Sequence, residues 1–142
     1  MKKATIGLII FCSILNFKCG DYYNAQIYNS REKDINVILI LGNKAIEIFN
    51  SNPYQPLFEI DERMGLKLLF FSKELRTAKI LVPSEKSFEV EFGTGFEPNF
   101  DLIQQIIILS GNDTISVKNK NDLKNAFKKT TENNGSHIYT II

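Results

Sequence analysis

Apolar and polar residues alternate along much of the chain, in the two-residue period of β-strands that bury one face. In the clearest segment, Ser87–Phe92, three side chains are expected to point inward, namely Phe88, Val90 and Phe92. Glu89 and Glu91 are expected to point outward from the same strand. Thr77–Val82 repeats the alternation, and strands recur at a spacing of roughly 10 residues, which is typical of an antiparallel meander or sandwich.

One segment is a continuous apolar run instead. Ile35–Leu41 is rich in β-branched residues and predicts a strand that is buried on both faces. After Gly42 and Asn43, the segment Lys44–Phe49 alternates again. Two strand patterns that are separated by a Gly-Asn pair predict a β-hairpin over Ile35–Phe49.

The segment 101–110 fits two structures. Asn99 or Asp101 could cap a helix, because the apolar residues between 102 and 107 have helical spacing. Ile106–Leu109 alone has the pattern of a buried strand, which a turn at Gly111–Asp113 would pair with the alternating residues that follow. We favour the strand, and both interpretations stay open at this point.

The end of the chain predicts a helix and a last strand. Asp122–Glu132 carries lysines on one side and an apolar stripe on the other, formed by Leu123, Ala126 and Phe127. His137–Ile142 then has a strand pattern. Together these elements predict an α+β fold with a mostly antiparallel β-sheet of six to eight strands and one amphipathic C-terminal helix.

The N-terminal residues have the pattern of an export signal. Met1-Lys2-Lys3 is positively charged, and the apolar run over residues 4–17 contains no charge. At ~1.5 Å of rise per residue, a helix of this run would span about 21 Å, less than the roughly 30 Å hydrocarbon core of a bilayer. The run therefore predicts a signal peptide rather than a permanent membrane span.

The apolar run ends at a cysteine. Lys18-Cys19-Gly20-Asp21 stops the apolar character abruptly, with Leu15 four positions before the cysteine. Residues 1–19 thus resemble the signal peptide of bacterial lipoproteins. The resemblance implies that Cys19 is lipidated and becomes the first residue of the mature chain. Cleavage after Ala25, which would give a secreted or periplasmic protein, is the alternative. An uncleaved anchor and the absence of export are the remaining ones.

These boundaries divide the chain into three parts, namely a signal peptide (1–18), a tether (19–34) and a single α+β domain (35–142). Removal of Lys2, Lys3 and Lys18 leaves fourteen basic residues against sixteen acidic ones, where the whole chain has seventeen against sixteen. The resulting net charge of −2 excludes a strongly basic nucleic-acid-binding surface. A protein of this charge needs its lipid to stay on a membrane.

The mature chain offers few groups for catalysis. It keeps no free thiol, and His137 is its only histidine. These residues predict no Ser-His-Asp triad, no zinc site and no cofactor. Glu89 and Glu91 are the weak catalytic candidates that remain, because a glycosidase needs only two carboxyl groups ~5–10 Å apart. A solvent-exposed stripe is the other interpretation of these two residues.

We therefore expect an exported, lipid-anchored module of the cell envelope with a non-enzymatic binding or inhibitor-type role. Its partner would be a protein or an envelope polymer, and no nucleic acid is expected. The alternative is a small carboxylate-dependent hydrolase of envelope polymers. A deep cleft with two converging carboxylates would favour the hydrolase, and a shallow face would favour the binding role.

Overall fold

The computed structural model describes residues 20–53, 57, 59–133 and 136–141. In this part of the chain nine strands form two sheets, together with two α-helices and a 3₁₀ helix. Sheet A has the order β5-β1-β9-β8, with the bounds Ser87–Thr94, Tyr22–Tyr28, Ser136–Ile141 and Lys128–Asn133. Sheet B has the order β3-β4-β2-β6-β7, with the bounds Lys67–Ser72, Thr77–Val82, Ile35–Leu41, Ile103–Ser110 and Asp113–Lys118. The helices are α2 (Asn43–Ser51), η1 (Glu62–Met64) and α3 (Lys120–Ala126).

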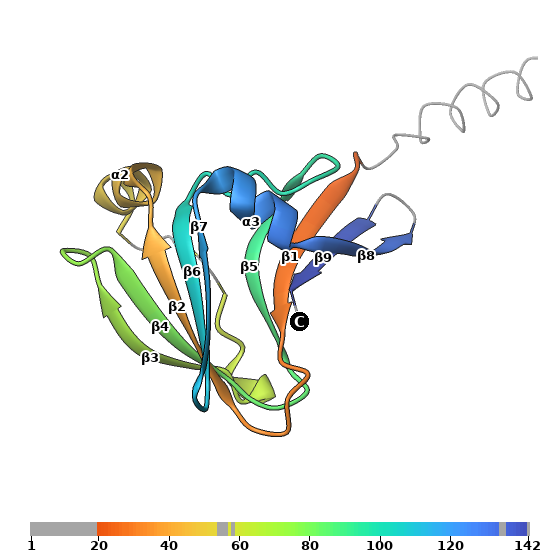
Figure 1. Ribbon diagram of the computed structural model, residues 1–142. Helices are drawn as coiled ribbons and strands as arrows, with labels where there is room; N and C mark the ends of the chain where they lie inside the picture. Colours follow the sequence, from red (N-terminus) through yellow and green to blue (C-terminus); the bar gives the residue numbers. More distant parts are fainter. Residues whose placement is uncertain (1–19, 54–56, 58, 134–135, 142) are drawn as a thin grey trace, which may run out of the picture.

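The predicted α+β class with mostly antiparallel pairing is confirmed (Figure 1). Neighbouring strands are antiparallel in every described pair except β1 and β9, which run parallel. The expected numbers of six to eight strands and one helix are wrong. Both are too low, because a strand forms in the expected tether and a helix forms where a hairpin was expected.

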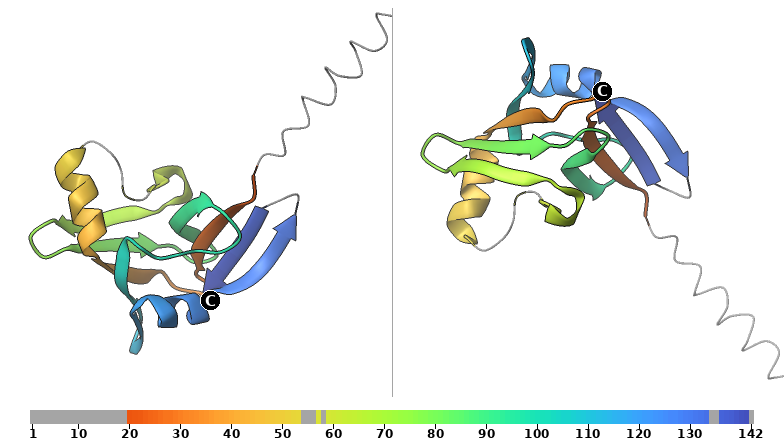
Figure 2. Two further views of the ribbon diagram at one scale, coloured as in Figure 1. Left: turned by 90° about the horizontal axis from the view of Figure 1, so that it is seen from above. Right: turned by 90° about the horizontal axis from the view of Figure 1, so that it is seen from below.

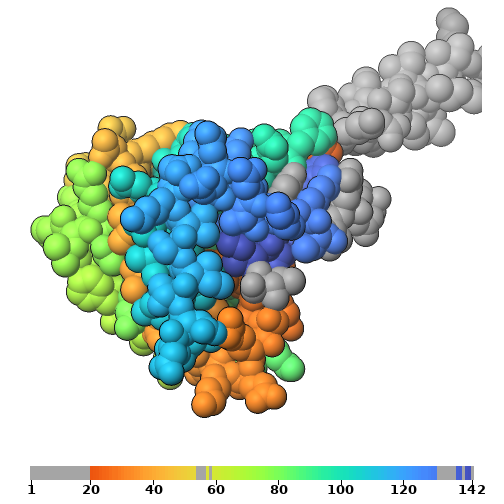
Figure 3. All heavy atoms as spheres, viewed as in Figure 1, coloured from red at the N-terminus to blue at the C-terminus, as the bar shows by residue number. Residues whose placement is uncertain are grey.

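One face of each sheet contributes to a single core. Fully buried side chains from both sheets belong to it, including Ala25, Ile27 and Phe88 of sheet A and Val37, Leu39, Ile80 and Ile106 of sheet B. The two α-helices lie at the upper end of the sheets in Figure 1 and add buried Ala45 and Leu123 to the same core. In the space-filling view, β7 and α3 cover the front and the β3–β4 hairpin projects at the left (Figure 3).

The segment after β2 is helical, so the hairpin predicted over Ile35–Phe49 is wrong. Its first strand, Ile35–Leu41, is confirmed. The apolar residues of 44–49 fit a helical repeat as well as they fit alternation, and tertiary packing decides between the two. Ala45 is buried in the core, and the ring of Phe49 stacks on Phe71 with centroids 5.0 Å apart.

The C-terminal helix is shorter than the predicted Asp122–Glu132. It ends at Ala126, and Phe127 already has an extended backbone. Leu123 and Phe127 are buried, as the apolar stripe predicted. The following residues form β8 because antiparallel pairing with β9 satisfies their backbone groups, and two threonines in this strand favour extended structure. No helix among the described residues is long and apolar enough to cross a membrane.

Strand β6 lies within the segment 101–110, for which the sequence left helix and strand open. It pairs with β7 in antiparallel register. The pairing begins with Ser110 opposite Asp113 and ends with Gln105 opposite Lys118. The strand that we favour there is therefore confirmed, and so is its hairpin partner.

The segment 19–34, expected to be a tether, contains a strand of the fold. β1 pairs with β5 on one side and with β9 on the other. The turn after it is held by Asn29, which is 1% exposed and whose Nδ2 donates to the carbonyl oxygens of Lys33 (2.9 Å) and Val82 (3.1 Å). The folded domain therefore begins at Tyr22, three residues after Cys19.

A β-bulge in β5 reverses the orientation of the residues that follow it. Ala25 faces Glu91, and the next residue of β1 faces Glu89, so that Val90 is an extra residue without a pairing partner. Glu91 therefore points to the core side, like Ala25. Phe92 points outward and is 60% exposed. The expectations of an inward Phe92 and of two glutamates on one face are wrong for this reason.

Candidate functional site

Glu91 is held in place at the core side of sheet A. Its Oε1 accepts hydrogen bonds from the Tyr23 hydroxyl (2.8 Å) and from the backbone N–H groups of Asn99 (3.0 Å) and Phe100 (3.2 Å). The carboxylate thereby fixes the loop between β5 and β6, in which Phe100 has a φ of 53°. We conclude that Glu91 has a structural role.

Glu89 lies on the opposite face of sheet A and lines a cavity of about 250 Å³. The cavity is formed by β1, β5 and the segment before β3, with the lining residues Asn24, Gln26, Glu59, Asp61, Met64, Leu66, Ser87 and Glu89. Asn24 Nδ2 donates a hydrogen bond to Oε2 of Glu89. Burial raises the pKa of Glu89 and the charge of Glu59 adds to this, whereas the hydrogen bond from Asn24 lowers it.

The two glutamates that the sequence singles out do not converge on one cleft. The cavity does contain two further acids, but Asp61 accepts hydrogen bonds of 3.0 Å and 3.2 Å from the Arg63 side chain, and these keep its pKa low. Among the described residues no group of three or more His, Cys, Asp or Glu side chains is placed to hold a metal ion. Burial thus raises the pKa of Glu89, whereas the Arg63 side chain lowers that of Asp61.

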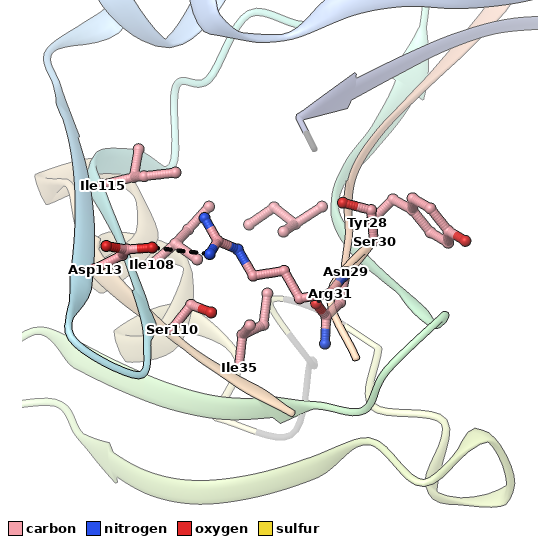
Figure 4. A pocket seen from close by; sticks show the side chains of 10 residues that line it. Tyr28, Asn29, Ser30, Arg31, Ile35, Ile108, Ser110, Asp113 and Ile115 are labelled. Carbon is pink, nitrogen blue, oxygen red and sulfur yellow. Dashed lines mark hydrogen bonds and ion pairs between the residues drawn. The ribbon is translucent and has the colours of Figure 1, made fainter. Parts of the chain in front are cut away.

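A second, much smaller pocket lies between the turn after β1 and the β6–β7 hairpin. Its volume is about 20 Å³, enough for a single water molecule. The Arg31 side chain crosses its mouth and reaches Oδ2 of Asp113 at 2.9 Å (Figure 4). The side chains of Arg31 and Asp113 are about half exposed. The ion pair therefore contributes little to stability.

His137 lies in β9, as the sequence predicts. Its side chain is buried, and its Nε2 lies 3.9 Å from Oδ1 of Asp21. The ring packs edge-on against Phe96, with centroids 5.5 Å apart. These contacts place the histidine within sheet A, outside the cavity that Glu89 lines.

The face of sheet B that points away from the core, hereafter the outer face, is not covered by any described element. Strand pairing places three rows of residues on it, namely Ser72-Thr77-Ile40-Gln105-Lys118, Phe70-Lys79-Ile38-Ile107-Ser116 and Lys67-Leu81-Asn36-Leu109-Thr114. Every one of these residues is at least partly exposed. The apolar side chains of α2 and α3 pack on the core instead.

The outer face combines apolar side chains with charge of one sign. Six of its residues are apolar, three are lysines (Lys67, Lys79 and Lys118), and none is acidic. None of these lysines forms a salt bridge in the part of the chain that the structure describes. At strand spacings of about 4.8 Å the whole face covers roughly 300 Å², and its six apolar side chains make up part of this area.

The sequence contained a signal for this face that our interpretation missed. Ile35–Leu41 is apolar on both sides, and we expect such a strand to be buried on both faces. The structure buries one side, with Val37 and Leu39, and leaves Ile38 and Ile40 partly exposed. Ile38 and Ile40 therefore contribute apolar surface to the outer face.

Cys19 lies outside the described residues, so the lipidation site stays a prediction from the sequence. No family model matches the chain, and no curated protein and no solved structure is similar to it.

Proposed function

We propose that this protein is an exported module of the cell envelope, anchored by a lipid at Cys19, that binds an acidic partner protein through the outer face of sheet B. Its role is binding or inhibition of that partner rather than catalysis. The observation that carries the proposal is the outer face itself, which combines six apolar residues with three lysines, is not covered by any described element and has no acidic residue.

The charge of the outer face selects the partner. Three lysines stand on this face although the mature chain would have a net charge of −2. A second copy of the chain would bring lysines against lysines, so self-association through this face is disfavoured. An acidic surface with apolar groups complements it, and such a complex weakens as salt rises.

Membrane fractionation tests the anchor. The wild-type protein is expected in the membrane fraction, with an intact mass that includes acyl chains on a chain that begins at Cys19. Cys19→Ser is expected to move the protein to an uncleaved precursor or to the soluble fraction. A soluble wild-type product that begins at Gln26 would contradict the anchor.

Site-specific photo-crosslinking in the native cell tests the binding face. A photoreactive side chain at Ile107 is expected to form one adduct, whereas the same probe at exposed Glu62 on η1 forms none. The purified partner is then bound to wild-type protein and to the triple variant Lys67→Glu, Lys79→Glu, Lys118→Glu. Binding that survives this charge reversal would refute the proposed face.

The cavity at Glu89 supports a second candidate, a carboxylate-dependent hydrolase of envelope polymers. A general acid needs a raised pKa in a partly buried site, and Glu89 has one. Glu59 would be its partner, because Asp61 is engaged by Arg63. Purified peptidoglycan and surface glycans that are cleaved by the wild type and not by Glu89→Gln would establish this function.

A further inference from the structure

Three exposed aromatic rings gather at the point where the chain enters the folded domain. Tyr22 is 38% exposed, Phe92 60% and Phe96 66%. The rings of Tyr22 and Phe92 contact each other, with centroids 5.8 Å apart. Gly95 N–H donates a 2.8 Å hydrogen bond to the carbonyl oxygen of Asp21, which ties the loop after β5 to the start of β1. We name these three rings the aromatic end.

The aromatic end lies away from the exposed apolar groups of the β3–β4 hairpin. Leu68, Leu69, Phe70 and Leu75 belong to the β3–β4 hairpin and its turn. In both views of Figure 2 this hairpin lies on the side of the molecule opposite to the start of β1. A single exposed ring on a protein surface is ordinary, but here the contacting pair Tyr22 and Phe92 lies at the same end of sheet A as Phe96, whose ring packs edge-on against His137 at 5.5 Å.

The short distance between Cys19 and Tyr22 indicates that the partner of the aromatic end is a membrane. Only Gly20 and Asp21 separate the predicted lipidation site from Tyr22. Three residue steps span at most about 10 Å in an extended chain. A lipid on Cys19 therefore holds the start of β1 at the headgroup region of the bilayer, which is the depth that aromatic side chains favour.

We infer that the aromatic end rests on the lipid bilayer and inserts Tyr22, Phe92 and Phe96 into its interface. This inference rests on the lipid anchor of the proposed function. It fixes the orientation of the anchored domain, because the rings and the lipid then hold the same end of sheet A. The β3–β4 hairpin and Phe70 of the outer face then lie on the side away from the membrane, where a partner can reach them.

The contact is apolar rather than electrostatic. The charged residues adjacent to the rings in sequence are Asp21, Glu91 and Glu97, all of them acidic, and Glu97 pairs with Lys124 at 3.1 Å. No excess of positive charge accompanies the rings. Insertion should therefore depend little on salt and on the fraction of anionic lipid, in contrast to a lysine-mediated contact.

Tryptophan fluorescence tests the inference, because the chain has no tryptophan of its own. The full-length lipidated variants Phe92→Trp and Phe96→Trp each carry one reporter in the aromatic end, and Leu75→Trp carries the matched reporter in the distant β3–β4 turn. The variants are reconstituted into phosphatidylcholine vesicles with and without brominated phosphatidylcholine. Emission of the first two is expected to shift to the blue and to be quenched at least about twofold more than that of Leu75→Trp.

A second measurement uses the protein without tryptophan substitutions, so it does not depend on whether the fold accommodates the larger side chain. Amide hydrogen exchange over residues 92–97 is expected to slow when the lipidated protein is on vesicles, and to stay unchanged when Cys19→Ser protein is mixed with the same vesicles. Unchanged exchange in the vesicle-bound lipidated protein would overturn the inference.

The outcomes separate this inference from the anchor on which it rests. If the protein does not sediment with vesicles, the lipid anchor fails and the bilayer contact fails with it. If it sediments but Phe92→Trp and Phe96→Trp are quenched no more than Leu75→Trp, the anchor stands and the bilayer contact is refuted. A blue shift that appears only when the acidic partner is added would assign the aromatic end to a protein instead.

Discussion

The hydroxyl of Tyr23 on β1 donates a 2.8 Å hydrogen bond to Oε1 of Glu91 on β5. The same oxygen accepts two backbone N–H groups, so one carboxylate oxygen joins β1, β5 and the loop that leads to β6. The β-bulge at Val90 makes this possible, because it turns Glu91 toward the core side. Removal of the Tyr23 hydroxyl should therefore weaken sheet A and the loop together.

Tyr23→Phe is expected to lower the free energy of unfolding by about 1–2 kcal/mol at pH 7, as for the loss of a partly buried hydrogen bond to a charged group. Urea denaturation followed by circular dichroism measures it. Tyr22→Phe, whose ring is exposed at the neighbouring position, is the matched control and should change stability by less than about 0.5 kcal/mol. Equal effects of the two substitutions would argue against the proposed role of Glu91.

The same pair predicts a loss of stability at high pH. Burial and the hydrogen bond to Glu91 raise the pKa of Tyr23 above the value of about 10 that an exposed tyrosine has. Because the folded state holds this proton more tightly, the stabilisation is complete below pH ~10 and is lost as the pH rises above it. The difference in unfolding free energy between wild type and Tyr23→Phe should therefore shrink from pH 9 to pH 11. A constant difference over this range would contradict the burial of a protonated tyrosine.

Gly93 is expected to tolerate no side chain. A Cβ at this position would lie 2.5 Å from the Tyr23 hydroxyl oxygen and 2.7 Å from its Cζ, and the buried ring has little room to move. Gly93→Ala should cost about 1–3 kcal/mol of unfolding free energy. Gly20→Ala, where a Cβ meets no atom within 4 Å, is the control and should have almost no effect.

Phe127 is expected to be among the residues on which stability depends most. It is 2% exposed and packs on Phe100 with ring centroids 4.9 Å apart. Phe127→Ala should cost about 3–5 kcal/mol, whereas Leu75→Ala at a 67% exposed position should cost less than about 0.5 kcal/mol. A loss below ~1 kcal/mol for Phe127→Ala in a urea titration would show that the side chain is not part of the core.

Glu89→Gln is expected to stabilise the protein at pH 7. The raised pKa means that the folded state disfavours the ionised carboxylate, so the wild type loses stability as the pH rises from ~4.3 through the higher folded pKa. Glutamine is always neutral and still accepts the hydrogen bond from Asn24. The gain in melting temperature should therefore vanish near pH 4, and Glu47→Gln, exposed on α2, should show no such pattern. A hydrolase would also lose activity in the more stable variant.

The strands with strict alternation could be predicted from the sequence because the two-residue period directly reports one buried face. Thr77–Val82 and the hairpin partner of β6 belong to this group. The predictions were wrong for segments whose structure depends on contacts with residues far away in the sequence. α2 depends on the contact of Phe49 with Phe71, and β1 depends on neighbours that lie more than 60 residues away along the chain.

The candidate site was harder to predict than the fold. One extra residue, Val90, reverses the faces of Glu89 and Glu91, and a β-bulge has no period that a sequence pattern can show. The outer face of sheet B is assembled from alternate residues of five strands, so its uniform charge emerges only once the register is known. The aromatic end likewise joins Tyr22 to residues 70 or more positions later.

The position of β1 between β5 and β9 has a consequence for the order in which the chain folds. β9 reaches β1 across 114 positions of sequence, as the hydrogen bond from Gln26 to Thr140 shows. A parallel pair with such a long loop closes late during folding, because the loop entropy must be overcome before the pairing is gained. While the ribosome is still making residues 128–141, sheet A lacks two of its four strands and cannot lock the chain into a compact body. If the chain is exported as we propose, it would thus stay incompletely folded until its last two strands are made, and sheet A would close only after translocation.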